Sequence, residues 1–142
     1  HNLAIGDKMS EDIKIHIGSA VPMEEEISMA VKGRDYLTGL PRSVDVSTNE
    51  IVRAIGKELR IMIGAVKDVL QETPPELAAD IIDHGITLTG GSSLLRNLAE
   101  LVFRRTGVKA RVAKDPQYCV AKGTGEVIKH LEVYKKAIIA KR

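Results

Sequence analysis

The chain has 142 residues, enough for one ordinary domain or for a piece with two lobes. Apolar residues make up 44% of it and aromatic residues only 3%, so a core must be built from aliphatic side chains. A net charge of +2 excludes the strong positive field of a nucleic-acid-binding domain, a lone cysteine (Cys119) excludes an intrachain disulfide, and no apolar run approaches the roughly 18 residues of a membrane span.

The N-terminal segment, residues 10–17, has an ambiguous pattern. Ile13, Ile15 and Ile17 alternate with polar residues, as they would in a strand. Ser10 followed by acidic residues is instead a helix-start signal, and Ile13 and Ile17 would share one face of a helix. Periodicity alone leaves both structures open.

Two short strands are expected over residues 26–31 and 43–47. Gly33 and Gly39 lie between them, which favours an antiparallel hairpin with a long loop.

A long helix is expected after the hairpin. Ser47 and Glu50 have the spacing of a capping box at its start. An apolar stripe with helical spacing then continues for about six turns and predicts a buried face. Its members are Ile51, Ile55, Leu59, Met62, Ile63, Val66 and Leu70. Pro74 and Pro75 end this helix and begin a short one through Ile82.

The second half alternates strands and helices. Gly85 marks the turn into a strand over residues 86–88, and an amphipathic helix follows two glycines and ends at Gly107. Another strand is expected over residues 109–112, and Asp115-Pro116 begins a last segment that is helical from about residue 123 to 140. This order predicts an α/β fold with a smaller appended α+β part.

The stretch from Ile86 to Leu95 carries the strongest functional signal, because two glycines and two hydroxyl residues separate a strand from a helix. Gly90 and Gly91 lack a Cβ, so the backbone there can pass close to a flat ring or a phosphate. The N-terminus of the following helix offers free N–H groups and a positive dipole end. The same residues also make an ordinary tight turn between a strand and a helix.

Residues 86–100 resemble the adenosine motif of the superfamily that contains actin, DnaK-type chaperones and sugar kinases. Residues 74–81 and 115–125 are similar to the MreB family of bacterial actins, as are residues 1–6 and 39–43. The resemblance covers essentially the whole chain and corresponds to the C-terminal part of an MreB protein.

The resemblance implies a division of the fold. Residues 1–70 would form mainly the smaller, outer α+β subdomain, with a helix beside the adenine, and lead into the long helix. Residues 71–142 would form an α/β, ribonuclease H-like subdomain of an actin-like ATPase, with the adenosine motif and a C-terminal helix. The family also favours a helix over residues 10–17. Since the chain begins with His1 and not Met, a fragment or a processed chain is expected.

The same resemblance implies the nucleotide contacts. Glu11 would accept a hydrogen bond from a ribose hydroxyl, and the Lys14 stem would lie beside the adenine ring. Gly90, Gly91 and Ser92 would form the opposite wall. Many family members have a third glycine where this chain has Ser92. Without the family, Glu11 and Lys14 would be interpreted simply as a surface ion pair.

Other candidate residues have structural explanations. Ala121, Gly123 and Gly125 resemble the second interdomain connection of the superfamily, where small residues allow a hinge or close helix packing. Asp80 and Asp115 are expected to cap helices rather than to catalyse. The four histidines and Cys119 lack the spacing of metal ligands, so no catalytic residue and no metal ligand are predicted.

The implied function is that of a filament subunit. The resemblance implies a cytoskeletal protein that binds ATP or ADP with Mg²⁺, polymerises with itself and organises cell-wall synthesis. Its filaments would be cytoplasmic and membrane-associated, with membrane contact through parts absent here and no nucleic-acid partner. The phosphate-binding Asp-x-Gly loops of the superfamily do not occur, so this chain alone is not expected to hydrolyse ATP. Half of a sugar or acetate kinase and a chaperone-type ATPase domain are the alternatives.

By family analogy, residues 36–42 form an outer loop. Tyr36, Leu37 and Leu40 place three apolar side chains within five residues there, a reasonable end-to-end contact in a filament. Isolated apolar residues on a surface loop would need no such role.

Overall fold

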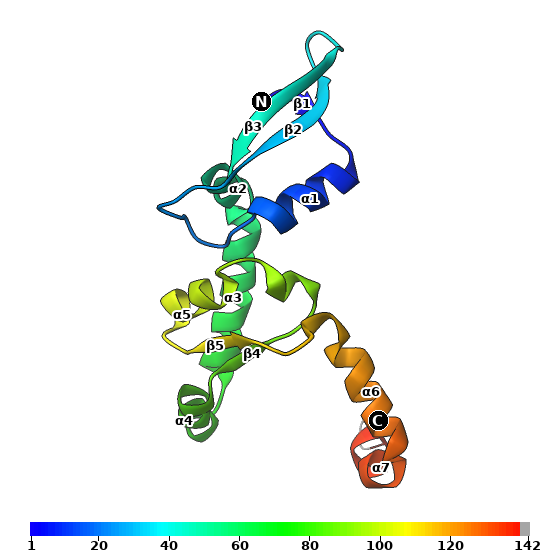
Figure 1. The fold of residues 1–142 in the computed structure, drawn as a ribbon. Coiled ribbons are helices and arrows are strands. Elements are labelled where there is room, and N and C mark those ends of the chain that lie inside the picture. The colour runs from blue at the N-terminus through cyan, green and yellow to red at the C-terminus, as the bar shows by residue number, and fades with distance from the viewer. Residues whose placement is uncertain (140–142) are drawn as a thin grey trace.

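The computed structural model describes residues 1–139, with side chains through residue 135. It has two lobes and a C-terminal pair of helices (Figure 1). We call the first the hairpin lobe: it consists of β1 (Leu3–Ala4), α1 (Asp7–Ile17), β2 (Ser28–Asp35), β3 (Pro41–Ser47) and α2 (Thr48–Ala54). The second, the parallel-strand lobe, consists of α3 (Gly56–Glu72), α4 (Pro75–His84), β4 (Ile86–Leu88), the 3₁₀ turn η1 (Gly91–Leu94), α5 (Leu98–Thr106) and β5 (Ala110–Val112).

The sheet of the hairpin lobe is antiparallel, with strand order β1-β2-β3, which confirms the predicted hairpin. Val31 lies opposite Val44 and Arg34 opposite Pro41, so the strands run further than expected and only residues 36–40 connect them. The reason is Asp35. Its carboxylate Oδ1 accepts hydrogen bonds of 2.9 Å from the backbone N–H groups of Leu37 and Thr38, which closes a tight turn directly after β2.

Helix α1 settles the ambiguity of the N-terminal segment. Ile13 and Ile17 are buried against Val31 of β2, whereas Ile15 is 62% exposed. A helix separates these residues in this way, because positions four apart share a face and the position between them does not. The helix begins one turn earlier than the sequence suggested, at Asp7 with Gly6 as its N-cap, so Ser10 lies inside it.

The long helix predicted over residues 51–70 is two helices. The capping box of Ser47 and Glu50 is present at the start of α2. At Ile55 the backbone leaves the helical region (φ −90°, ψ 1°), and α3 starts at Gly56, a residue with low helix propensity. Of the apolar stripe only Ile63 is fully buried; Ile55, Leu59 and Val66 are half-buried because nothing covers one side of α2 and α3 among the described residues.

The parallel-strand lobe has a two-stranded parallel sheet, with Ile86 opposite Ala110 and Leu88 opposite Val112. Pro75 is the first residue of α4, and Gly85, which has φ 79°, follows its last turn; the sequence predicts both the helix start and the turn. Leu98, Leu101 and Val102 of α5 pack on Ile63 of α3 and on Ala20 and Val21 to form the core of this lobe.

The helix expected immediately after the glycines begins later. Residues 91–94 form the 3₁₀ turn η1, Asn97 then adopts a left-handed conformation (φ 60°), and α5 starts at Leu98. The predicted end at Gly107 is confirmed, since Gly107 has φ 76° and its N–H donates to the carbonyl of Phe103 at 2.8 Å.

The C-terminal segment consists of the 3₁₀ turn η2 (Pro116–Tyr118), α6 (Cys119–Lys129) and α7 (Leu131–Ile139). In Figure 1 the two helices extend away from both lobes. Helix α6 starts four residues before the predicted Gly123, and the segment is interrupted at His130; residue 140, the predicted end, lies outside the described residues. No helix of the described part of the chain is long and apolar enough to cross a membrane.

Neither predicted aspartate cap is present. Asp80 lies in the middle of α4. Asp115 adopts a left-handed conformation (φ 50°), makes no capping hydrogen bond, and instead accepts a hydrogen bond of 2.6 Å from the Lys122 ammonium.

Candidate functional site

One wall of the candidate site is the exposed face of α1. The ammonium of Lys14 donates to Glu11 Oε2 at 2.7 Å, and both side chains are about half exposed. Burial of Ile13 and Ile17 on another side of α1 leaves this face exposed. An exposed ion pair contributes under about 1 kcal/mol, so either group can exchange its partner for a ligand at small cost.

The other wall is the turn between β4 and η1. Gly90 has φ 85° and ψ 165°, a region that is essentially restricted to glycine. Its N–H donates to the carbonyl of Pro116 at 2.8 Å, and its own carbonyl accepts a hydrogen bond of 2.7 Å from Ser93 Oγ. Ser93 is 4% exposed and anchors the turn. Sequence reasoning missed Ser93; a hydroxyl residue three positions after a glycine of a tight turn is the signal that could have identified it.

The space beside the two glycines is open. A Cβ built on Gly90 meets no atom within 4 Å, and one on Gly91 meets only the Gln117 side chain, at 3.8 Å or more. Ser92 is exposed, and its side chain makes no hydrogen bond to any described residue. A flat ligand could therefore approach the backbone here without displacing a side chain of either lobe.

The two walls are held together by direct contacts between the lobes. The end of α1 and the residues after η1 run side by side: the Ala20 N–H donates to the Arg96 carbonyl at 2.8 Å, and Asn97 Nδ2 donates to Ser19 Oγ at 3.2 Å. Arg96 Nη2 also reaches the carbonyl of His16 at 3.4 Å. Lys14 and Glu11 precede His16 by two and five residues, which is about 3 and 8 Å along the helix axis. The structure thus joins the end of α1 to the segment that follows the glycine turn.

Gly18 has little space at this junction. A Cβ on Gly18 would lie 2.3 Å from the carbonyl oxygen of Lys14, in α1 itself, and 3.1 Å from the side chain of Leu95 in the other lobe. Because the closer neighbour is backbone, only glycine fits without movement of the backbone. Gly18, Arg96 and Asn97 are further residues on which the site depends and which sequence reasoning did not identify.

The charges near the turn also come from its neighbours. Asp115 directly precedes η2, whose Pro116 bonds to Gly90, and the hydrogen bond from Lys122 to Asp115 raises the pKa of the Lys122 ammonium above its usual range. The backbone N–H groups of Gly91 and Ser92 donate to no acceptor outside η1 among the described residues, so both are available to a ligand.

The open backbone of the glycine turn and the exposed ion pair of α1 offer the hydrogen-bond donors and acceptors that ligand binding requires. Among residues 1–135 no group of three His, Cys, Asp or Glu side chains could hold a metal ion. The small residues Gly123 and Gly125 lie in α6, where a Cβ would meet nothing within 4 Å in either case. They therefore make no close helix crossing with the described residues, and a hinge role stays a prediction.

The combination of an antiparallel hairpin lobe with a parallel-strand lobe that carries the glycine turn defines an α/β protein of the actin-like type. A family model described as "MreB/Mbl protein" matches residues 1–136, and the chain belongs to this family. The family disfavours the kinase and chaperone alternatives.

Individual relatives agree with this assignment. The chain is 41% identical to the cell shape-determining protein Mbl of Bacillus cereus, over 93% of its own length and 40% of that protein. It is 42% identical to the cell shape-determining protein MreB of Escherichia coli K12, over 92% and 38% of the two chains. The crystal structure of Spiroplasma citri MreB5 bound to ADP matches 96% of the chain with a TM-score of 0.86 and 39% identity. The chain spans about two fifths of the length of these relatives.

Proposed function

We propose that this chain contributes the adenosine side of the nucleotide pocket of an actin-like filament protein that determines cell shape. The observation that supports the proposal is the direct contact between the end of α1 and the segment after η1, which joins the lobe that carries Glu11 and Lys14 to the lobe that carries the open glycine turn. The ADP-bound MreB5 of the same fold supports an adenine nucleotide as the ligand.

In this proposal each residue has a defined task. The Glu11 carboxylate accepts a hydrogen bond from the ribose, and the Lys14 stem lies along one edge of the adenine. Gly90 and Gly91 present bare backbone to the ring, and the free N–H groups of Gly91 and Ser92 donate to polar atoms of the nucleotide. ATP or ADP with Mg²⁺ is the proposed cofactor, with the phosphates and the metal held by residues outside this chain.

The proposed protein polymerises with itself, as the resemblance to bacterial actins implies, and works with the cell-wall synthesis machinery on cytoplasmic filaments at the membrane. In this proposal residues 1–70 mainly form the outer subdomain and lead into the long helix α3, which packs in the other lobe, and residues 71–142 form the ribonuclease H-like subdomain. Hydrolysis requires the β and γ phosphates to be gripped beside Mg²⁺, so the chain alone binds ATP weakly and does not cleave it.

The test measures binding of a fluorescent ATP analogue to the full-length protein and, separately, to the chain alone. Gly91→Val places a branched side chain on the glycine wall, and Glu11→Ala removes the ribose acceptor; each should weaken binding about tenfold or more. Gly6→Val and Asp68→Ala are the matched controls, because Gly6 has an equally open environment and Asp68 is an exposed acid on α3. Tight binding by the chain alone, or equal losses in the controls, would contradict the half-pocket.

A further inference from the structure

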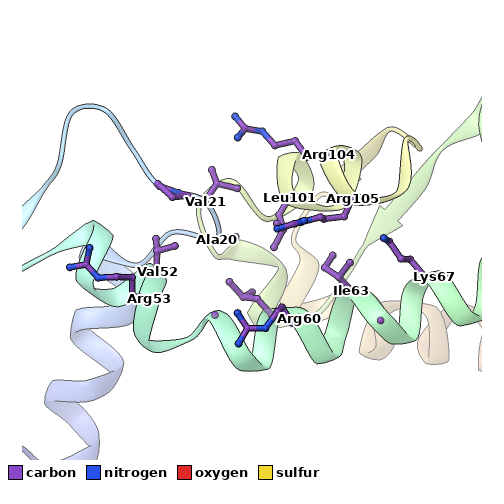
Figure 2. Close-up of a pocket in the computed structure, with 14 residues that line it drawn as sticks. Ala20, Val21, Val52, Arg53, Arg60, Ile63, Lys67, Leu101, Arg104 and Arg105 are labelled. Atoms are coloured by element: carbon purple, nitrogen blue, oxygen red, sulfur yellow. The ribbon is translucent and has the colours of Figure 1, made fainter.

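A second concave region lies on the side of the molecule formed by α2, α3 and α5. Figure 2 shows it between α3 and α5, and the loop that carries Ala20 and Val21 closes one end. Its volume is about 870 Å³, which is comparable with a binding site for a short peptide or a large small molecule. We call it the basic basin. The residues of the proposed nucleotide site, Glu11, Lys14 and Gly90 to Ser92, do not line it.

The floor of the basic basin is apolar. Val21, Leu59, Ile63 and Leu101 line it, and these side chains also belong to the core of the parallel-strand lobe. The half-buried state of Leu59 is therefore explained: one side of this residue faces the core and the other faces the basin. Such a floor favours a ligand with apolar groups of its own.

The rim carries only positive charge. Arg53, Arg60, Lys67, Arg104 and Arg105 line the basin, and no acidic residue does. Arg104 points away from α3 in Figure 2 and pairs with Glu100 at 2.5 Å, whereas Arg105 extends toward α3. The other four rim cations, Arg53, Arg60, Lys67 and Arg105, form no ion pair within 4.0 Å among the described residues. Four cations around an apolar floor are thus left for a partner.

We propose that the basic basin docks an acidic segment of a partner protein that inserts apolar anchor residues between its charges. A phosphate ion would satisfy the cations but not the floor, and a neutral apolar ligand would leave the cations unused. Arg60 and Lys67 lie seven residues apart on α3, about 10 Å, which matches two turns of an amphipathic helix with anchors at positions i, i+3 and i+7. Complementary charge would set the orientation and the rate of association.

The experiment titrates the full chain into a labelled 14-residue helical peptide with leucines at i, i+3 and i+7 and glutamates elsewhere, and follows fluorescence anisotropy. A peptide of the same composition with scrambled leucines, and one with lysine in place of glutamate, should bind at least about tenfold more weakly. Absence of binding by the designed peptide up to about 1 mM, or equal binding of the scrambled peptide, overturns the proposal.

Two kinds of variant locate the site. Arg60→Glu with Arg105→Glu reverses the rim, and Lys32→Glu with Lys114→Glu applies the same charge change to exposed residues outside the basin. The rim variant should lose at least about tenfold in affinity and the control should lose less than about twofold. Equal losses would mean that net charge alone attracts the peptide and would overturn the docking site.

Gly64 allows the same test without a change of charge. It lines the basin in the middle of α3, and a Cβ there meets no atom within 4 Å, so a larger side chain can enter the space without strain. Gly64→Leu should block the peptide and Gly64→Ala should not, while both raise helix propensity and keep the melting curve of the chain intact. Peptide binding that survives Gly64→Leu overturns the proposal.

Other occupants give different results. Anionic lipid vesicles or inorganic phosphate are added as competitors. If either displaces the peptide as effectively as unlabelled peptide does, and binds the rim variants more weakly, then that anion and not an acidic peptide is the ligand class. A concentration-dependent dimer that the rim variant abolishes would point instead to a second copy, whose acidic residues 24–26 could enter the basin. Either outcome contradicts an acidic partner segment.

Discussion

The hairpin lobe and the parallel-strand lobe reach their structures by different routes. In the hairpin lobe each strand pairs with its neighbour in the chain, and two local devices fix the ends: the Asp35 turn after β2 and the capping box at the start of α2. Its core is small, with Ile13, Ile17 and Val31 fully buried. Local signals of this kind are visible in the sequence.

In the parallel-strand lobe the two strands are joined through η1 and α5, and within the described residues they pair only with each other. Large apolar side chains stay exposed around them, including Ile82 at 66%, Leu94 at 56% and Phe103 at 47%. Parallel sheets are usually larger and covered on both faces. The comparison teaches that the β2–β3 hairpin is specified by contacts between adjacent segments, whereas the parallel pair forms only when two strands joined through a helix meet.

The candidate nucleotide site lies where these two lobes meet. Its acidic and basic residues come from the hairpin lobe and its glycines from the other, and contacts of Gly18, Arg96 and Asn97 join the two lobes. The predictions below therefore separate the stability of one lobe from the attachment of the two.

The largest effect is expected for Ile17→Ala. Ile17 is 1% exposed in the small core of the hairpin lobe, and its truncation should cost about 2–5 kcal/mol of unfolding free energy because neighbours cannot collapse into the cavity. Urea denaturation followed by circular dichroism measures the loss. A loss below about 1 kcal/mol would show that this lobe adds little to the cooperative fold. Leu59→Ala is the matched comparison and should cost less, because Leu59 is only half-buried.

Gly18→Ala should be next in size and should act on the attachment of the lobes. The new Cβ would lie 2.3 Å from the Lys14 carbonyl, so the backbone must shift, at a cost of about 1–3 kcal/mol. Gly6→Ala is the matched control, because Gly6 has negative φ and no atom within 4 Å of a Cβ. Hydrogen exchange should show faster opening at Ala20 in the Gly18 variant alone. Unchanged exchange there would contradict a close contact at this junction.

Much of the fold was predictable because its signals are local. The capping box of Ser47 and Glu50, the stop at Pro74-Pro75 and the turns at Gly85 and Gly107 each depend on one short segment, and the structure has all of them. The errors fall where local preference is weak: the break at Ile55, the late start of α5 and the interruption at His130. The apolar residues keep their helical spacing on both sides of such breaks, so periodicity cannot detect them.

The candidate site was only partly predictable. Glycines and hydroxyl residues after a strand indicate a ligand-binding turn. The roles of Glu11 and Lys14 came from family resemblance, and the position of α1 relative to the turn depends on tertiary contacts. Gly18 illustrates the limit. Its φ of −67° is ordinary, and only the packing of Lys14 and Leu95 around it makes glycine necessary. A single sequence contains no signal for a contact between residues about 80 positions apart, such as Arg96 with His16.

A smaller and local effect is expected from pH. Hydrogen bonds from the Thr38 and Leu37 backbone N–H groups and from Arg42 lower the pKa of Asp35 from 3.8 to about 2. A carboxylate whose pKa is lower in the folded chain than in the unfolded chain stabilises the fold when the pH is above the pKa of the unfolded chain. This contribution disappears as pH falls from about 4 to about 2. Amide signals of residues 36–40 should lose their dispersion in that range. Asp35→Asn should remove this transition while Asp45→Asn, on an exposed site of β3, keeps it.

The smallest effect on stability, and the most specific one on assembly, is expected in the loop after β2. Leu37 and Leu40 are 82% and 65% exposed, so Leu37→Asp with Leu40→Asp should change the unfolding free energy by less than about 0.5 kcal/mol. Two carboxylates in an apolar end-to-end contact would remain unpaired when subunits meet, and filament growth should therefore fail. Sedimentation of the full-length protein with ATP measures growth, and Ile61→Asp with Val69→Asp on the exposed face of α3 is the control for added charge.

A folded loop variant that pellets like the parent protein would remove this loop from the contact, whereas loss of pelleting in both variants would assign the effect to net charge. Failure of the loop variant alone would mean that the hairpin lobe supplies a polymer contact through a turn set by Asp35, while the junction with the parallel-strand lobe serves the nucleotide.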